Sequence, residues 1–116
     1  MSTFTKQLLS GSTDGMGILV AQAATPGTTI HTAHATSKDE IWVWAINMDT
    51  AERGLTLEWG GATDPDNLIG KAVPIPINAG PILIVPGLIL TNSKVLKAFA
   101  ASANKLVLVG YVNRIG

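Results

Sequence analysis

The sequence predicts an all-β protein, an antiparallel β-sandwich of about eight short strands that is either jelly-roll-like or immunoglobulin-like. Three observations favour this fold class. Short runs rich in Val, Ile, Leu and Thr alternate in hydrophobicity with period 2, which is typical of strands. Clusters of Gly, Pro, Asn and Asp separate these runs at spacings usual for a sandwich or a small barrel. No stretch carries a helical repeat that predicts a helix of more than about two turns.

Residues 1–16 are predicted to form an N-terminal assembly arm, and residues 17–116 the β-sandwich domain. The arm is rich in Ser, Thr and Gly, which hold a regular element poorly without tertiary contacts. Its apolar side chains Phe4, Leu8 and Leu9 are therefore expected to bind a partner. On this hypothesis, a chain without the arm keeps nearly its full thermal stability but assembles poorly.

Residues 39–59 contain all three tryptophans and are predicted to form a β-hairpin around an Asx- and Gly-rich turn. The first run is apolar on both faces, as expected of a central strand with something packed on each side. Trp42 and Trp44 share one of these faces. We expect at least one of them in the core and the other in an inter-subunit contact. The second run alternates Leu and Trp with Thr and Glu, which predicts one solvent-facing side.

The other strands are predicted from the same alternation. Pro74 and Pro76 would leave missing N–H groups on one edge, which predicts an edge strand or none. Residues 94–101 fit a helix of two turns as well as a strand, but the hairpin signal that follows favours the strand. Gly110 is expected to mark a bulge or a close approach. The predicted segments are 17–24, 28–33, 68–77, 81–85, 88–90, 94–101 and 105–115.

The composition favours a protein that associates with other chains. Only 14% of the residues are charged while 47% are hydrophobic, and the formal net charge is zero. A weakly charged, neutral monomer is prone to association, so we expect another chain to cover part of its surface. No basic patch for nucleic acid and no apolar run of membrane-spanning length is present in the sequence, so neither is an expected partner. The chain has no cysteine, which fits assembly in a reducing cytosol.

Few residues are candidates for catalysis or metal binding, and each has a simpler interpretation. His31 and His34 point to opposite faces of a strand, so we expect surface side chains and no shared metal. Ser10 lies in the arm without a recognisable base or nucleophile motif. Asp64 and Asp66 lack the spacing of a calcium loop and are typical of Asx turns. We therefore expect no catalytic residue, no metal and no cofactor.

Six stretches of the chain resemble a group of small virion proteins from tailed bacteriophages. Together these stretches span nearly the whole chain, and their order is more specific than any one of them. They are LLSGSTDG (8–15), ATPGTTIHTA (24–33), DEIWVWAIN (39–47), LTLEWGG (55–61), IVPGLILTN (84–92) and FAASANKLVLVGYVNRI (99–115). The resemblance implies a non-enzymatic β-sandwich that is built into the particle, and it supplies no catalytic residue to carry over.

The expected function is therefore that of a virion structural protein, assembled in the host cytoplasm. A capsid decoration (cement) protein is favoured, which would self-associate and bind the major capsid protein. A homo-oligomer is expected, with a trimer as the first expectation, and Phe4, Leu8, Leu9, Trp42 and Trp44 are the expected partner-binding residues. A head–tail connector or a tail component is the alternative. A carbohydrate-binding module with tryptophans as a sugar platform is more distant, and an enzyme is third.

Overall fold

The computed structural model describes residues 3–116 as nine antiparallel strands in two sheets. These residues contain no helix, so the predicted all-β sandwich is confirmed. None of them forms a helix of the length and apolar character that crossing a membrane requires. The strands are β1 (Phe4–Leu8), β2 (Ile18–Leu19), β3 (Thr28–Thr32), β4 (Lys38–Asn47), β5 (Arg53–Trp59), β6 (Leu68–Ile75), β7 (Ile82–Leu90), β8 (Val95–Ala100) and β9 (Leu106–Ile115).

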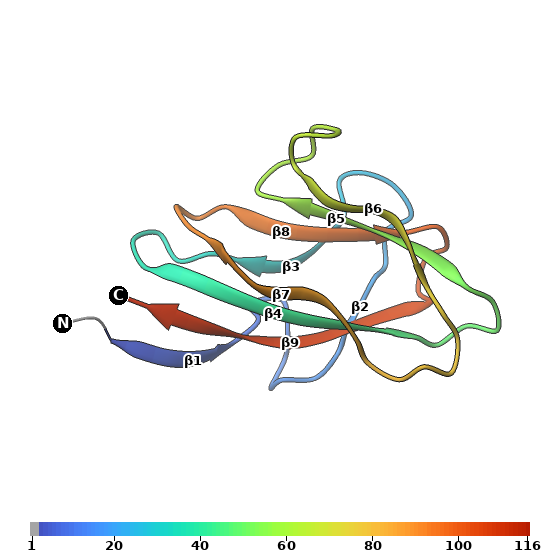
Figure 1. The fold of residues 1–116 in the computed structure, drawn as a ribbon, viewed down its shortest axis with the longest axis horizontal. Coiled ribbons are helices and arrows are strands. Elements are labelled where there is room, and N and C mark those ends of the chain that lie inside the picture. The colour runs from blue at the N-terminus through green and yellow to red at the C-terminus, as the bar shows by residue number, and fades with distance from the viewer. Residues whose placement is uncertain (1–2) are drawn as a thin grey trace.

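The two sheets lie one above the other (Figure 1). Sheet A has the order β1-β9-β4-β7, with β2 also paired to β9, and sheet B has the order β3-β8-β5-β6. The chain is a long hairpin that has been rolled up: β1 and β2 pair with β9, β3 with β8, β4 with β7, and β5 with β6. This strand order is that of a jelly roll, which decides between the two predicted kinds of sandwich.

The core lies between the sheets and follows the predicted alternation. Ile41, Val43 and Ala45 of β4 point inward and are fully buried. Leu55 and Leu57 of β5 meet them from sheet B. The strand β9 contributes every second residue in the same way, and Gly110 lies opposite Val43 of β4, its neighbour in the sheet. A Cβ at Gly110 would be 2.0 Å from the carbonyl oxygen of Trp42, so this position is the close approach predicted for it.

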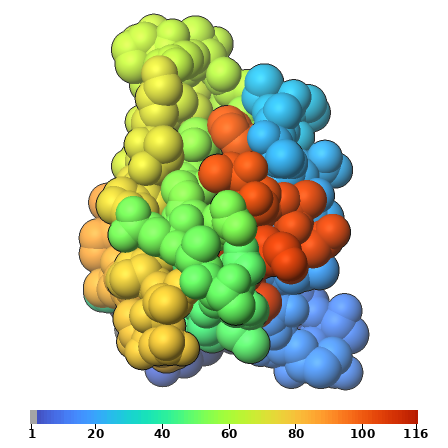
Figure 2. All heavy atoms as spheres, turned by 90° about the vertical axis from the view of Figure 1, so that its right-hand side faces the viewer, coloured from blue at the N-terminus to red at the C-terminus, as the bar shows by residue number. Residues whose placement is uncertain are grey.

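The predicted tryptophan hairpin is wrong, because β4 and β5 belong to different sheets and do not pair. The turn between them is a corner from sheet A to sheet B. The Asn47 amide Nδ2 donates to the carbonyls of Ala51 at 3.0 Å and Ile75 at 2.7 Å, which fixes this corner. Figure 2 shows that the corner, in green, lies between the segment before β7, in yellow, and the turn before β9, in orange-red. Alternation predicts a strand but not the sheet to which it belongs.

The solvent-facing side predicted for β5 is also wrong. Thr56 and Glu58 are buried, although they alternate with the core residues of β5. The Thr56 hydroxyl accepts a hydrogen bond from the Ala72 N–H at 3.0 Å. The Glu58 carboxylate accepts from the Gly27 N–H at 2.6 Å and from the Thr25 hydroxyl. The loop before β3 therefore covers the outer face of sheet B around Glu58, and β6 contacts Thr56.

The remaining strands differ from the predictions mainly in length. Only Ile18–Leu19 of segment 17–24 is a strand, because the backbone N–H groups of residues 21 and 22 turn to the Thr28 hydroxyl. The segments 81–85 and 88–90 form one bulged strand, β7, which continues through Pro86. The edge strand β6 and the strands β3, β8 and β9 are confirmed.

Candidate interaction surface

The N-terminal segment closes one side of the sandwich. β1 pairs with β9 from Phe4 opposite Ile115 to Leu8 opposite Tyr111. Leu9 then enters the core, where only 1% of it is exposed. The Gly11 N–H donates to the Ile30 carbonyl of β3 at 2.9 Å, so the segment leaves sheet A and caps the edge of sheet B.

This placement differs from the predicted arm. Phe4–Leu8 is a strand of the chain's own sheet, and Leu9 is a core residue and not a contact for a partner. Phe4 and Leu8 do keep 71% and 53% of their surface exposed. The sequence could not separate Leu8 from Leu9, because two adjacent leucines point to opposite faces of a strand whose pairing partner lies about a hundred residues away.

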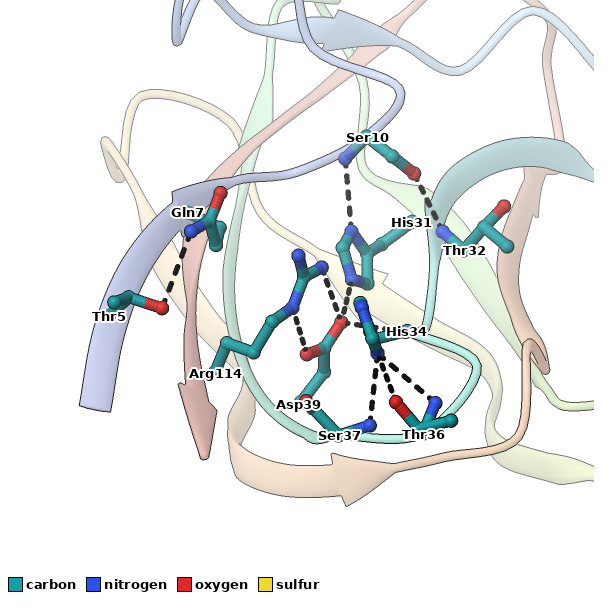
Figure 3. A network of polar contacts seen from close by, with 10 residues as sticks. All are labelled: Thr5, Gln7, Ser10, His31, Thr32, His34, Thr36, Ser37, Asp39 and Arg114. Atoms are coloured by element: carbon teal, nitrogen blue, oxygen red, sulfur yellow. Dashed lines mark hydrogen bonds and ion pairs between the residues drawn. The ribbon is translucent and has the colours of Figure 1, made fainter. Parts of the chain in front are cut away.

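A buried polar network pins the N-terminal segment to both sheets (Figure 3). The Ser10 N–H donates to His31 Nδ1 at 3.0 Å, and the Ser10 hydroxyl accepts from the Thr32 N–H at 2.7 Å. His31 Nε2 lies 2.7 Å from Asp39 Oδ2, and only 1% of His31 is exposed. Because Nδ1 accepts a backbone N–H, the ring proton is on Nε2 and points to Asp39. Because His31 is buried, its predicted surface position is wrong.

Asp39 is the centre of this network. The Arg114 guanidinium donates to both carboxylate oxygens, at 2.8 and 3.1 Å, and the His34 N–H donates at 3.1 Å. Burial raises the pKa of Asp39, but the hydrogen bonds from Arg114, His31 and the His34 backbone outweigh it and hold the pKa below its ordinary value. The carboxylate is thus a stable anion that ties β4 to β9 and to β3.

The Ser10, His31 and Asp39 side chains do not form a nucleophilic site. The contact between Ser10 and the imidazole runs through the backbone N–H, and the hydroxyl is held by Thr32. A serine nucleophile needs its own Oγ within hydrogen-bond reach of the base. Among residues 3–116, no three His, Cys, Asp or Glu side chains gather closely enough to hold a metal ion. We assign the network a structural role.

The outer face of sheet A, which we call the aromatic face, carries side chains that the chain leaves partly exposed, and the turn at Gly15 and Gly17 lies against Leu8 and Val107 at its edge. Its side chains alternate with the buried ones of β4 and β9 and form rows across the strands. Val109 and Trp44 are opposite each other between the last two rows. In order along β9, the rows are Phe4–Ile115–Lys38, Lys6–Asn113–Glu40, Leu8–Tyr111–Trp42 and Leu19–Val107–Ile46.

Three aromatic rings occupy the middle of this face. The ring centroids of Trp42, Trp44 and Tyr111 are 6.1 to 6.5 Å apart, and the ring planes differ by 14° to 27°. Both tryptophans are half-buried on the outside of the sheet, so the prediction that one of them belongs to the core is wrong. Ile41 and Val43, their neighbours along β4, fill the core instead. Both strand faces are apolar, and local sequence does not say which one turns inward.

Two opposite charges border the rings. The Lys6 ammonium lies 5.0 Å from the centroid of Tyr111, a cation–π contact. Glu40 Oε1 accepts from the Trp42 indole N–H at 2.7 Å and from the Asn113 amide at 3.2 Å. These two hydrogen bonds lower the pKa of Glu40, so it is an anion at neutral pH. The aromatic face is therefore mainly apolar, with Lys6 and Glu40 in one row and Lys38 as a second cation at the end of the face.

The structure brings together four of the five residues predicted to bind a partner. Phe4, Leu8, Trp42 and Trp44 lie on the aromatic face, whereas Leu9 does not. Nothing in the local sequence singled out the other residues of this face, Lys6, Glu40, Asn113 and Tyr111. The available signal was the alternation of β9, which places Val107, Val109 and Tyr111 on one strand face, but nothing local aligns that face with Trp42 and Trp44.

The outer face of sheet B has two hollows, one of them lined by Lys94, Lys97 and Glu58. The other, of about 350 Å³, lies beside Phe99 and Thr56, with the Lys71–Asp64 ion pair at its edge. Glu58, the buried acid of this hollow, already accepts two hydrogen bonds from the loop before β3. The aromatic face is therefore the better candidate for function.

No protein-family model matches the chain, and no curated protein is significantly similar to it in sequence.

Proposed function

We propose that this chain is a non-enzymatic structural protein of a tailed-phage virion, and specifically a capsid decoration protein. In this role it self-associates and binds the major capsid protein, after assembly in the host cytoplasm. The resemblance of its sequence stretches to small phage virion proteins supports the class of protein. Jelly rolls are common in viral capsid and lectin domains, which supports it at the level of fold analogy alone.

The observation that carries the proposal is the aromatic face. Apolar side chains of four strands, among them Phe4 and Leu8, lie open beside three aromatic rings. Contiguous exposed apolar surfaces of this kind mark protein interaction sites, and Trp and Tyr are the residues that most often dominate binding energy there. A binding role needs no catalytic group, and the polar network of the chain serves the fold.

The same face fits the alternative position in the virion, a head–tail connector or a tail component. Both positions need a rigid β domain with an apolar docking surface. The genes beside this one separate them: a neighbouring major capsid protein gene favours decoration, and neighbouring tail genes favour the alternative.

A carbohydrate-binding module is the second candidate, and one observation favours it. The rings of Trp42, Trp44 and Tyr111 are nearly parallel and half-exposed, and aromatic rings of this kind stack on sugars. Glu40 and Asn113 would supply polar contacts beside them. Specific glycan binding that Trp44→Ala abolishes, without particle binding, would favour this candidate over the virion protein.

The direct test is mass spectrometry of virions purified from the phage or prophage that encodes the chain. We expect a stoichiometric amount in the particle and rebinding of purified protein to particles that lack it. Leu8→Glu, on the aromatic face, should abolish rebinding or assembly. Ile69→Glu is the matched control, because Ile69 is a similarly exposed aliphatic residue on β6 of the other sheet. Absence of the chain from purified virions would refute the proposal.

A further inference from the structure

We infer that two copies of this chain pair through their aromatic faces, about a twofold axis that runs parallel to β9. This inference specifies the self-association in the proposed function and rests on that part of it alone. The partner is therefore a second copy of this chain, and the contact is isologous, with the same surface on both sides.

The first argument is the arrangement of charge. Lys6 on β1 and Glu40 on β4 lie on either side of Asn113 of β9, in one row across the sheet. A rotation of 180° about an axis above β9 exchanges the positions of β1 and β4. It therefore places Lys6 of one copy opposite Glu40 of the other, and it does so twice. The chain forms no Lys6–Glu40 ion pair within itself, since β9 separates the two strands.

The apolar rows match under the same rotation. Leu8 lies in the row of Trp42, so each Leu8 meets the indole of the second copy, and Tyr111 meets its own equivalent on the axis. In the last row Leu19 and Ile46 are on either side of Val107 and are exchanged in the same way. Side chains on β1 and β2 thus match those on β4 in three rows, whereas Phe4 comes opposite Lys38 and Trp44 has no counterpart on β1 or β2.

The matched part of the face has the size of a weak interface. The strands that face each other under this rotation are β9 and β4, of 10 residues each, and the edge formed by β1 and β2, of 5 and 2 residues. With strands about 4.8 Å apart they cover on the order of 400 Å² in flat projection, and protruding side chains make the accessible area larger. A stable interface buries about 800 Å² on each partner, so we expect a pair that forms at micromolar concentrations. Two sheets packed face to face lie about 10 Å apart, a distance that Lys6 and Glu40 can span together.

A closed trimer does not use the face in this way. Threefold symmetry joins two different surfaces of each chain, so a face that is complementary to itself remains unmatched. A trimer of the chain is therefore expected only through another surface, such as the loops at the end of the sandwich.

The experiment is sedimentation velocity of the full chain at about 1 to 100 μM, with charge-reversal variants. The wild type is expected to form dimers in this range. Lys6→Glu makes the row wholly negative and Glu40→Lys makes it wholly positive, so each variant alone should dimerise about tenfold or more weakly. An equimolar mixture of the two variants should form heterodimers with near wild-type affinity, because both ion pairs are then restored.

A matched control separates this geometry from a general attraction of opposite net charges. Lys94→Glu and Asp66→Lys carry the same charge changes at exposed positions of sheet B and its loops. Their mixture should dimerise no better than the wild type, and neither variant alone should weaken the dimer. Circular dichroism melting of each variant verifies that it is folded.

Three results would overturn the inference. The first is a wild-type monomer at the highest concentration, the second is a dimer that both reversals leave unchanged, and the third is a mixture without heterodimers. These outcomes are distinct from failure of the proposed function, which is decided by the content of the virion. A charge-sensitive dimer that is absent from virions would keep the pairing and refute the virion role.

Discussion

The two outer faces of the sandwich are built from similar alternating strands, but the chain covers them to different extents. On sheet B the loop before β3 covers part of the outer face, because it bonds to Glu58 and packs closely on β8, while Phe99 of the same face stays half-exposed. A Cβ at Gly27 would lie 2.6 Å from the backbone of Ala98, so glycine is needed for this contact. On sheet A the rings of Trp42 and Trp44 stay half-exposed, with Gly87 of β7 against the Trp42 indole. The polarity of a strand's outer face therefore does not predict whether another part of the chain or a partner covers that face.

The largest expected effect is that of deleting residues 1–16. The deletion removes strand β1, the core residue Leu9 and the Ser10 contacts to β3. Burial of a leucine alone is worth about 2–5 kcal/mol, and total stability of a domain is about 5–15 kcal/mol, so we expect the truncated chain to be unfolded or marginal. This reverses the expectation from sequence. Circular dichroism melting checks it, with Phe4→Ser as a folded control, and a cooperative transition near the wild-type temperature would restore the arm hypothesis.

Asp39→Asn is expected to be the most damaging single change in the polar network, at about 3–5 kcal/mol, because it leaves Arg114 and His31 without their anion. The effect depends on pH. The pKa of Asp39 is below its ordinary value of 3.8 in the folded state, so the stability it supplies is complete above pH 3.8 and is lost as the pH falls through the folded-state pKa. Urea unfolding of both proteins between about pH 7 and pH 2 should show the difference shrinking only below that value. A constant difference would contradict this assignment.

Leu9 and Leu8 are adjacent residues that test the boundary between core and aromatic face. Leu9→Ala should lower the free energy of unfolding by about 2–5 kcal/mol, because Leu9 is fully buried. Leu8→Ala should lower it by less than about 1 kcal/mol, because Leu8 is exposed. Denaturant melts of the two variants measure both values. Similar values for the two would mean that the register of β1 differs from the one described.

Glu58 and Glu40 allow a direct comparison of the two outer faces. Glu58 lies on sheet B and Glu40 on sheet A, and each carboxylate accepts two hydrogen bonds. Glu58→Gln should cost about 1–3 kcal/mol, because Gln offers one acceptor oxygen where the Thr25 hydroxyl and the Gly27 N–H use two. Glu40→Gln should change stability less, because water replaces its bonds on an open face. Thermal melts give the ranking, and hydrogen exchange at Gly27 should rise in the first variant alone. A larger loss for Glu40 would mean that sheet A is covered within the chain.

Much of the fold could be predicted from local sequence. Alternating hydrophobicity identifies strands β3, β4, β8 and β9, because the direction of a strand side chain depends only on its immediate neighbours in the chain. The prolines of β6 identify an edge strand, because each proline lacks an N–H for pairing. Of the candidate site, Trp42 and Trp44 were found for the same reason, together with the exposed Phe4 and Leu8. The close approach at Gly110 could also be expected, since a strand glycine often marks one.

Tertiary structure alone decided which sheet each strand joins and which strand face turns inward. The corner at Asn47 and the burial of Glu58 and His31 depend on partners distant in the chain: Ile75, Gly27, and Asp39 with Ser10. A polar residue in a strand is equally compatible with water and with a buried partner, and the free energy of the two differs only once the partner is in place. The sequence by itself thus determined that the chain forms alternating strands of a sandwich. Pairing across the rolled hairpin determined that its aromatic rings face outward, because the smaller aliphatic side chains on the other face of β4 fill the space between two sheets about 10 Å apart.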